Sequence, residues 1–403
     1  MIPSYSVSPT DPAFFNDPYP AYDEMRALGP AFRWREYDLA CFAGHETVNA
    51  LLRDRRLGRE ATHVMSREEA GLGAIPDRLK PFYDFESRSL LEREPPAHTR
   101  LRGLVNRAFL SRNVDRLRPR IAALAHQLVD GFKDQGAIDL LPAFAEKIPV
   151  IVIAELLGVP TAMSDRMLAW SHAMVAMYQY NRDRATEDRA VAATLEFSAF
   201  IRDTIEYRRG RPGDDLVTAL IAAEAAGDKL SADELVTTCI LLLNAGHEAT
   251  VHAIGNGVKA LLENGVAGRF GGGEAALAHC DELLRFDAPL HLFTRHVLEP
   301  LEFAGVALRR GQKVGLLLGA ANRDGARYAD PHRLDFARGG AGHLAFGAGI
   351  HFCVGAPLAR LEMATAIPVL FERLPGLRLA ARPVYADRYH FHGLAALPLA
   401  WDA

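Results

Sequence analysis

The sequence predicts a mainly α-helical protein with a minor β region, and three observations lead to this prediction. Apolar residues recur at steps of three and four through the middle of the chain, which is the spacing of one helix face. One much longer helical run begins at Ser231 and continues to about Glu263. Short runs of β-type composition lie at 31–43 and 294–318. We therefore expect a small sheet beside a large helical mass.

The elements can be justified in chain order. The β-type run at 31–43 leads into 43–47 (Ala-Gly-His-Glu-Thr), which we expect to open a short surface helix, since a helix N-terminus tolerates Glu. A second helix is predicted to end at Gly136, because glycine commonly ends a helix. Its apolar stripe consists of Leu117, Ile121, Leu124, Leu128 and Phe132. The capping-box pattern Ser-Ala-Asp-Glu at 231–234 starts the longest helix. A turn-like 310–312 precedes the strand-like 314–318.

Composition and charge exclude several classes of protein. Of the 403 residues, 49% are hydrophobic and 24% are charged, which is typical of globular proteins and argues against disorder. The formal charge of −4 is too balanced to indicate nucleic-acid binding. No repeat or long linker marks a domain boundary.

Cysteine usage and the N-terminus predict the compartment. The four cysteines are far apart and contain no C-x-x-C pair, which argues against a disulfide framework and a structural zinc site. Residues 1–6 lack the basic and apolar segments of a signal peptide, and no charge-free run reaches membrane-spanning length. We expect a cytoplasmic protein that is not bound to a membrane.

The centre of the longest helix contains two residues that an interior helix avoids. Apolar side chains occupy every face of 239–250, so this helix is expected to cross the interior. There, Gly246 costs about 1 kcal/mol relative to Ala, and the carboxylate of Glu248 must be paired. In one interpretation, Gly246 lets another backbone pack closely and Glu248 reaches a wet crevice or an Arg. In the other, Gly246 makes room for a flat ligand or small molecule, and Glu248 handles protons.

A glycine-rich loop at 346–360 holds Cys353 just before a predicted helix. Glycine permits close backbone approach, and free N–H groups at a helix start stabilise a thiolate, which suits a metal-ligating sulfur. A phosphate-binding loop fails because the G-x-x-x-x-G-K-[ST] spacing is absent. A nucleophilic cysteine with His351 as its base, and an inert buried thiol, stay open on local grounds.

The loop as a whole reads Phe-Gly-x-Gly-x-His-x-Cys-x-Gly followed by Leu-Ala-Arg, and it resembles the haem-binding loop of the cytochrome P-450 family. The resemblance implies that Cys353 is the axial thiolate ligand of a haem b iron. It also implies that Phe346, Gly347 and Gly355 belong to the cofactor-binding loop.

Further motifs of the same family follow in order. The stretch from Ala245 to Glu248 looks like the oxygen-binding part of the family's long central helix, and Glu282 and Arg285 match its E-x-x-R motif. Arg338 falls where the family has the third member of this charge network. The resemblance runs from residue 17 to residue 394. It therefore implies one domain over 1–403, with the long central helix over the haem.

Four residues occupy positions where the family binds the haem propionates. They are His98, Arg102, Arg295 and His351. Two carboxylates beside an apolar macrocycle need several donors, and Arg and His provide charge-assisted hydrogen bonds.

One position departs from the family. The helix acid is usually followed by Thr, whose hydroxyl helps to deliver protons, but here Ala249 follows Glu248. The hydroxyl of Thr250 cannot simply substitute, because one residue rotates a side chain by about 100° around the helix. Our hypothesis is that Glu248 remains the proton-relay acid while ordered water or a substrate hydroxyl replaces the missing alcohol.

By the resemblance, the protein is a monooxygenase that inserts one atom of O2 into a C–H bond or across a double bond. Electrons then come from separate proteins such as a ferredoxin and its reductase, for which Arg107 and Arg360 are candidate docking residues. We expect a monomer that binds neither nucleic acid nor membrane. A haem-thiolate sensor and a peroxide-driven oxygenase are the alternatives.

A mostly apolar pocket over the haem is expected to select a hydrophobic small molecule. The expected lining residues are Phe82, Phe85, Met174, Met177, Tyr178, Leu242, Leu290, Leu292, Phe293 and Phe391. Three of the polar side chains nearby could orient a polar group of the substrate, namely Tyr178, His291 and His392.

Overall fold

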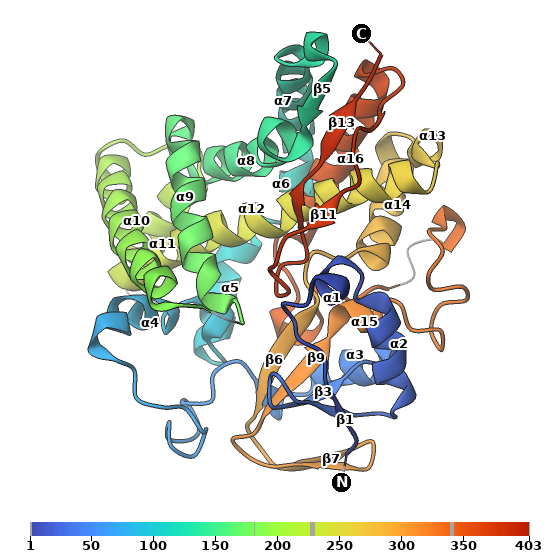
Figure 1. Ribbon diagram of the computed structural model, residues 1–403. Helices are drawn as coiled ribbons and strands as arrows, with labels where there is room; N and C mark the ends of the chain where they lie inside the picture. The colour runs from blue at the N-terminus through green and yellow to red at the C-terminus, as the bar shows by residue number, and fades with distance from the viewer. Residues whose placement is uncertain (1, 181, 226–229, 339–341, 403) are drawn as a thin grey trace.

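A layer of helices and a smaller sheet region make up the computed structural model, which describes residues 2–180, 182–225, 230–338 and 342–402 (Figure 1). The predicted fold class is confirmed. The helices are α1 Pro12–Asn16, α2 Tyr19–Ala27, α3 His45–Arg53, α4 Lys80–Glu86, α5 Ala97–Asn106, α6 Ser111–Val114, α7 Arg118–Asp130, α8 Lys147–Leu157, α9 Ser164–Val175, α10 Arg184–Gly210, α11 Leu216–Ala225, α12 Ala232–Glu263, α13 Ala267–Phe270, α14 Gly273–Phe286, α15 Leu318–Ala321 and α16 Ala356–Arg373. The strands are β1 Ser4–Tyr5, β2 Phe32–Trp34, β3 Leu39–Phe42, β4 Leu57–Gly58, β5 Ala137–Asp139, β6 Leu292–Val297, β7 Leu301–Phe303, β8 Val306–Leu308, β9 Lys313–Leu317, β10 Arg378–Leu379, β11 Val384–Tyr385, β12 Leu394–Ala396 and β13 Pro398–Ala400.

Helix α12 crosses the middle of the molecule (Figure 1). It begins and ends where the sequence predicts. The Ser231 side chain accepts a hydrogen bond from the backbone N–H of Glu234, and the Glu234 carboxylate accepts one from the N–H of Ser231, which completes the capping box. Helices α8, α9, α10, α14 and α16 pack against α12. The centre of α12 is therefore enclosed by other helices.

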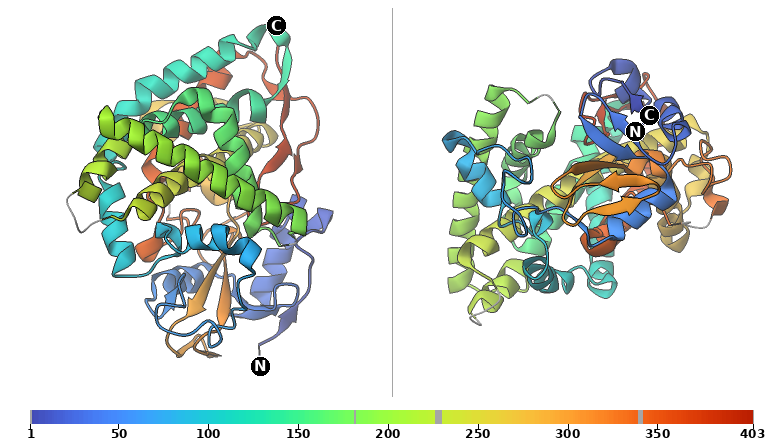
Figure 2. Two further views of the ribbon diagram at one scale, coloured as in Figure 1. Left: turned by 90° about the vertical axis from the view of Figure 1, so that its left-hand side faces the viewer. Right: turned by 90° about the horizontal axis from the view of Figure 1, so that it is seen from below.

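The main sheet has six strands in the order β1-β2-β3-β9-β6-β4. Strands β6 and β9 pair antiparallel, and β3 pairs parallel with β9. Strands from both predicted β-type runs join this sheet, which lies at the end of the molecule opposite most of the helices (Figures 1 and 2). Strands β7 and β8 of the second run pair with each other in a separate two-stranded sheet. Strand β6 carries Arg295, opposite Val314 of β9.

The predicted helix with the stop at Gly136 is shorter than expected. Helix α7 ends at Asp130 with Gly131 as its C-cap, so neither Leu117 nor Phe132 belongs to it. A separate 3-10 turn follows, and Gly136, with φ +73°, ends that turn instead of the helix. The sequence pattern merged two consecutive elements because they share an apolar face.

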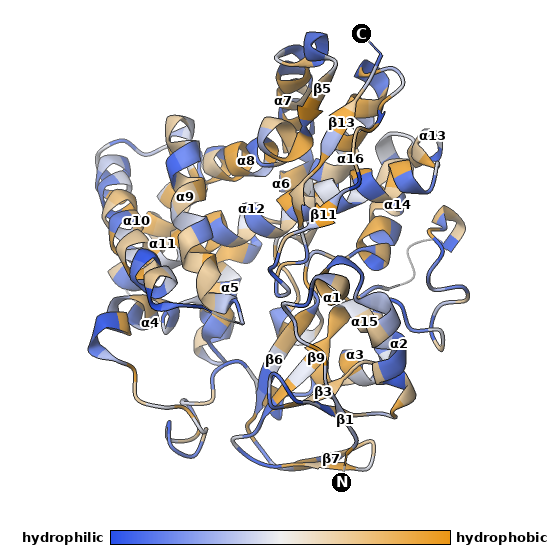
Figure 3. Ribbon diagram, in the orientation of Figure 1, coloured by the Kyte–Doolittle hydropathy of each residue, from blue (hydrophilic) through white to orange (hydrophobic). Residues whose placement is uncertain are grey.

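Apolar residues concentrate in the inner helices. Figure 3 shows α8 as largely hydrophobic, whereas the outer α10 carries many polar residues. Helix α3, predicted from 43–47, forms with Gly44 as its N-cap and buries one face through residues such as Val48 and Leu51. Among the described residues, no helix is both long and apolar enough to cross a membrane.

Candidate functional site

The loop before α16 is held by close backbone contacts. The N–H of Cys353 donates to the carbonyl oxygen of Phe346 at 3.0 Å, which closes the loop on itself. Gly347 and Gly349 have φ of +68° and +73°, a region that disfavours side chains. A Cβ on Gly349 would also lie 2.4 Å from the Leu52 carbonyl oxygen of α3. These contacts explain why the loop needs its glycines.

The Cys353 sulfur lies in a recess. Its side chain is exposed, whereas those of the other three cysteines are buried. Burial by surrounding protein atoms nevertheless raises the pKa of the Cys353 thiol, while the backbone N–H groups of Gly355 and Ala356 and the charges of Arg102 and Arg360 act to lower it. The sulfur is therefore accessible to solvent but also surrounded by many protein atoms. This combination indicates that it faces an internal space. The donors around it favour a thiolate.

One stripe of α12 is also accessible although the helix is otherwise enclosed. Ala245 is exposed, and Leu241 and Ala249, one turn to either side, are partly exposed, whereas Leu242, His247 and Glu248 are buried. Residues four apart lie on one helix face, so Leu241, Ala245 and Ala249 face a common internal space. We call these three residues the α12 stripe. Helix α16, which follows Cys353, packs against the same α12.

Gly246 is partly exposed next to Ala245 and also packs closely against α8. A Cβ at Gly246 would lie 2.8 Å from Ile153 Cγ1 of α8, so the missing side chain is needed for helix packing. This contact supports the interpretation in which Gly246 allows close packing. The Thr250 hydroxyl donates to the Gly246 carbonyl oxygen at 3.4 Å and is buried, so it is engaged within the helix backbone, away from the α12 stripe.

Glu248 is buried among histidines. Its Oε2 lies 3.3 Å from His172 Nε2 of α9 and 3.5 Å from His247 Nε2, and its Oε1 lies 3.9 Å from His252 Nε2. Burial acts to raise the pKa of Glu248, but His172 and His247 outweigh it and hold that pKa well below its usual range. The nearby carboxylate of Glu248 raises the pKa of His172, whose side chain is 42% exposed. The acid therefore has a partner that reaches solvent.

A second group of polar residues converges near the cysteine loop. The rings of His98 and His351 lie 4.6 Å apart between centroids, and His351 Nε2 lies 2.9 Å from Glu94 Oε1. His98 is only 4% exposed, and its Nε2 has no hydrogen-bond partner in the described part of the chain. Burial, followed by His351 and Arg102, lowers the pKa of His98 to about 4.

Arg295 and Arg102 add positive charge to this group. Arg295 is 3% exposed and donates to the carbonyl oxygen of Thr294 at 2.9 Å, and no ion pair among the described residues includes it. Burial lowers the pKa of Arg295 to about 9. The Arg102 Nη2 donates to the carbonyl oxygen of Phe352 at 2.6 Å, next to Cys353. We call His98, Arg102, Arg295 and His351 the donor cluster.

The donor cluster fits the propionates of a haem. A buried guanidinium without an acid and a buried imidazole without an acceptor are both costly, and carboxylates supply what each lacks. The Cys353 sulfur, the α12 stripe and the donor cluster match the ligand, the apolar face and the carboxylate anchors that such a group needs. The sequence-predicted residues fit the cofactor that the resemblance implies.

The predicted charge network is assembled and buried. Arg285 donates from Nε to Glu282 Oε2 at 2.7 Å and from Nη2 to Oε1 at 2.8 Å, and Arg338 Nε donates to Glu282 Oε1 at 3.2 Å. The remaining Arg285 donors reach carbonyl oxygens of residues 322, 331 and 333. Glu282 and Arg285 are 3% and 2% exposed, so this pair does not lie on a solvated face.

Five of the ten predicted pocket residues belong to the main hydrophobic cluster, which extends over much of the helical core. Those in the main hydrophobic cluster are Phe82, Phe85, Met174, Met177 and Leu242. Leu290 forms an isolated β-bridge with Phe391, which joins the loop before β6 to the C-terminal region. Leu292 does not join them, because it packs in a separate cluster with Phe14 and Trp34. Phe293 points to the opposite face of β6, against a third cluster.

The three side chains that were expected to orient a polar group of the substrate each contact another protein side chain. The Tyr178 hydroxyl donates to Glu86 Oε2 at 2.7 Å. His291 is fully buried, and its Nδ1 lies 2.8 Å from the Tyr22 hydroxyl. His392 is 2% exposed, and its Nε2 lies 3.3 Å from Asp287. Enclosure of His291 and His392 in this internal network contradicts the expectation that they orient a substrate.

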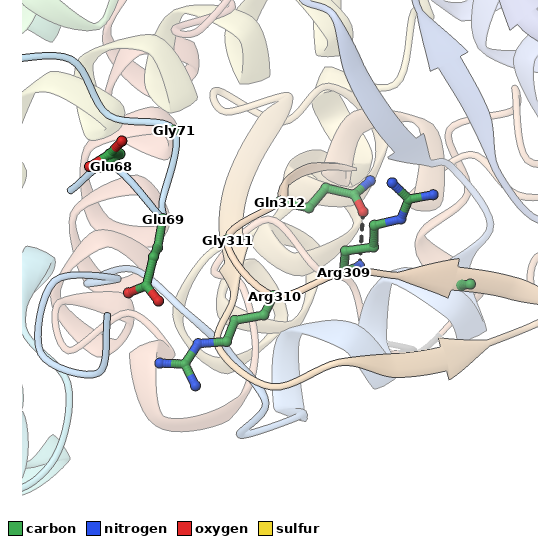
Figure 4. A pocket seen from close by; sticks show the side chains of 8 residues that line it. Glu68, Glu69, Gly71, Arg309, Arg310, Gly311 and Gln312 are labelled. Atoms are coloured by element: carbon green, nitrogen blue, oxygen red, sulfur yellow. Dashed lines mark hydrogen bonds between the residues drawn. The ribbon is translucent and has the colours of Figure 1, made fainter. Parts of the chain in front are cut away.

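A surface pocket of about 540 Å³ lies elsewhere (Figure 4). It is lined by Glu68, Glu69, Gly71, Ala307, Arg309, Arg310, Gly311 and Gln312. None of the predicted site residues lines it, and its charged walls do not suit an apolar molecule. We therefore assign it no part in the site.

Sequence reasoning missed two residues of the site. Glu94 holds His351 and lies within the same stretch as His98, so an acid among predicted anion-binding residues was a usable signal. His172 contacts Glu248 from α9, 76 positions earlier in the chain. No local pattern around His172 marks that contact, because it arises only when α9 packs on α12.

The chain is similar to known proteins over nearly its whole length. A cytochrome P450 family model matches residues 277–374. The chain is 37% identical to cytochrome P450 monooxygenase PikC of Streptomyces venezuelae over 96% of this chain and 92% of the relative. It is also 37% identical to 6-deoxyerythronolide B hydroxylase of Saccharopolyspora erythraea over 97% of each. The solved structure of epothilone D-bound cytochrome P450epoK matches with a TM-score of 0.90 at 30% identity, over 99% of this chain and 100% of that chain.

Proposed function

The chain belongs to the cytochrome P450 family and is a haem-thiolate monooxygenase, and from this premise we propose that Cys353 is its iron ligand. The observation that carries the proposal is the Cys353 sulfur, which lies in a recess at the start of α16 with backbone N–H groups directed at it. Haem b, the cofactor of the family, supplies O2 activation and transfer of one oxygen atom when bound.

The donor cluster holds the cofactor's carboxylates in this proposal. Arg295 and His98 are the principal anchors because both are buried and, among the described residues, Arg295 forms no ion pair and His98 Nε2 has no hydrogen-bond partner. His351 and Arg102 complete the set beside the cysteine loop. Glu94 is a positioning residue, since it fixes the ring of His351 through Nε2. Glu282, Arg285 and Arg338 stabilise the fold behind the loop.

Proton delivery is assigned to Glu248. The carboxylate is held ionised next to His172, which reaches solvent, so a proton can pass from water through His172 to Glu248. Ala249 provides no hydroxyl on the α12 stripe, and the Thr250 hydroxyl is bound to the helix backbone. Water or a substrate hydroxyl beside Ala245 and Ala249 therefore completes the path. Ala249→Thr should raise the product formed per NADPH, and an unchanged ratio would contradict this assignment.

We propose a bulky hydrophobic molecule of the size and character of 6-deoxyerythronolide B as the substrate. The support is the apolar wall from α4, α9 and α12 and the bridge between Leu290 and Phe391. One relative is named for hydroxylating 6-deoxyerythronolide B, and one similar structure holds epothilone D. A monooxygenase role fits these relatives better than a sensor or a peroxide-driven oxygenase.

Electrons come from a separate redox partner, for which we propose a ferredoxin with its reductase. Arg107 is exposed and remains a candidate docking residue. Arg360 fits that part less well, because it donates to Asp281 at 2.6 Å and lies over the Phe346 ring at 4.6 Å. We also propose that residues 1–403 form one monomeric domain that works in the cytoplasm, with the cysteine usage of the sequence as support for the location.

Substrate binding can be tested by the spin-state change of the haem. Titration with 6-deoxyerythronolide B should convert the spectrum to high spin, whereas a linear hexadecanoic acid should bind at least tenfold more weakly. The variant Phe391→Ala should weaken the first titration, and Phe303→Ala, a half-buried phenylalanine of β7, should not. Tighter binding of the fatty acid would contradict the proposed substrate class.

A further inference from the structure

A cluster formed by His172, His247 and Glu248 has the composition and geometry of a metal site. Two imidazole nitrogens and one carboxylate oxygen converge, with all three atoms within 4.8 Å of one another. Two histidines and one acidic residue are a common ligand set for zinc. We call these three residues the histidine–glutamate cluster.

The hydrogen bonds of His247 show which of its ring nitrogens can bind a metal. His247 Nδ1 lies 2.7 Å from the carbonyl oxygen of Leu243, which only accepts, so Nδ1 carries the hydrogen and donates it. Nε2 is the ring nitrogen left for a ligand, and it faces Glu248 Oε2 across 3.5 Å. A metal ion between Nε2 and Oε2 takes one lone pair from each of them.

Burial makes a missing partner costly for both atoms. His247 and Glu248 are 1% and 4% exposed. Within the described part of the chain, neither His247 Nε2 nor Glu248 Oε2 has a hydrogen-bond partner. Unsatisfied buried groups of this kind are costly. A carbonyl that holds the other ring nitrogen is also the usual support of a metal-binding histidine.

The distances suit a small divalent ion. Two ligand atoms of a tetrahedral site with bonds of about 2.0–2.1 Å are roughly 3.3–3.4 Å apart. Glu248 Oε2 lies 3.3 Å from His172 Nε2 and 3.5 Å from His247 Nε2. The site is reached from outside through His172, whose side chain is 42% exposed. A cavity of about 60 Å³ lies beside it and leaves room for a water as fourth ligand.

Charges around the cavity permit a cation. Glu146, Arg388 and His252 line it together with Glu248. The carboxylates of Glu146 and Glu248 outnumber the single guanidinium of Arg388, and a divalent cation reduces the net charge.

A second cluster of two histidines and one acidic residue differs from the first in its access to solvent. Asp287, His291 and His392 also converge, but all three are buried. The Asp287 oxygens accept hydrogen bonds from the hydroxyl groups of Tyr19 and Tyr385. These bonds occupy both oxygens of Asp287, and none of the three residues is exposed, so this cluster lacks the route from solvent that His172 provides in the other.

We propose that the histidine–glutamate cluster binds a Zn²⁺ ion through His172 Nε2, His247 Nε2 and a Glu248 carboxylate oxygen, and that the bound ion inhibits turnover. Inhibition follows because zinc occupies the carboxylate that passes protons, and this consequence rests on the proposed function of Glu248. Binding itself does not depend on that function. The ligand atoms come from two helices, so binding also ties α9 to α12.

Calorimetric titration of the haem-loaded, chelator-treated protein with ZnCl2 tests binding directly. The variants His172→Gln and His247→Gln should each weaken affinity about 10- to 100-fold. His332→Gln is the matched control, because His332 is an exposed histidine 3.1 Å from Asp23 without a third ligand, and this variant should bind zinc as the wild type does. Unchanged affinity in both cluster variants would overturn the site.

Zinc-edge X-ray absorption on the wild-type protein gives a result that does not depend on the folding of a variant. Nitrogen and oxygen ligands at about 2.0–2.1 Å support the site, and a sulfur shell at about 2.3 Å would overturn it in favour of a cysteine. Zinc should also slow product formation, and EDTA should restore it. Zinc bound with the expected ligands but without effect on turnover would contradict the proton role of Glu248 and leave the site standing.

Discussion

His98 and His351 lie with their ring centroids 4.6 Å apart, although they come from α5 and from the loop before α16. Glu94 Oε1 lies 2.9 Å from His351 Nε2 and also accepts a hydrogen bond from the backbone N–H of Arg59, whereas His98 Nε2 has no hydrogen-bond partner among the described residues. The contact thus brings together two distant parts of the chain that both carry anion-binding groups. In the proposed function, this pair anchors the haem carboxylates on the side of the cysteine loop.

The first prediction concerns haem retention. Arg295→Leu and His98→Leu should each release haem to apomyoglobin at least tenfold faster, because each removes a charge-assisted hydrogen bond to a propionate, worth about 1.5–3 kcal/mol. Arg309→Leu, which removes an exposed arginine, is the control and should leave the rate unchanged. Equal release rates for all three variants would remove the donor cluster from haem binding.

The second prediction concerns the proton-relay acid. Glu248→Gln should lower product formation by about 100-fold, the usual effect of losing a proton-transfer group, while more of the NADPH is spent without product. The chain contains a matched control, because Glu46 follows the same Gly-His pair at the start of α3. Glu46→Gln should keep wild-type turnover. If Glu248→Gln retains full product formation, another group carries the proton.

The third prediction concerns stability. Arg285→Lys should lower the free energy of unfolding by about 3–5 kcal/mol, because lysine cannot replace the paired donors to Glu282 and leaves a buried acid partly unpaired. Urea unfolding measures this. Arg333→Lys, at an exposed arginine 2.6 Å from Asp335, should cost less than about 1 kcal/mol. Equal small losses in both variants would contradict a structural role for the buried pair.

A feature of this fold could be predicted from the sequence when its signal lies in neighbouring residues, and it could not when it depends on contacts between distant segments. The capping box at Ser231 and the glycines around Cys353 act through neighbouring residues, so α12 and the cysteine loop could be located from sequence. The end of α7 could not, because its apolar face continues into the next turn. Resemblance placed Glu282 near Arg338, but only packing shows that His172 meets Glu248 and that Ile153 fills the space at Gly246.

The fourth prediction is a pH dependence of stability. Burial, followed by the charge of Lys313, lowers the pKa of His296 from 6.5 to about 4. The unfolded chain therefore binds more protons between these values, so this contribution to stability is present above pH 6.5 and is lost as the pH falls towards 4. Between pH 6.5 and 4, the free energy of unfolding of His296→Gln should therefore fall by roughly 1–2 kcal/mol less than that of the wild type. His332→Gln should not change it, and an identical pH profile for His296→Gln would refute the assignment.

The most direct test of the central claim, that Cys353 holds the haem iron as a thiolate, is the visible spectrum after dithionite reduction and CO addition. The wild-type protein should show the strongly red-shifted Soret band of a thiolate-bound haem. Cys353→Ser should lose that band, and Cys280→Ser, which alters a buried cysteine, should keep it. A wild-type protein that binds no haem, or a Soret band typical of histidine ligation, would contradict the account.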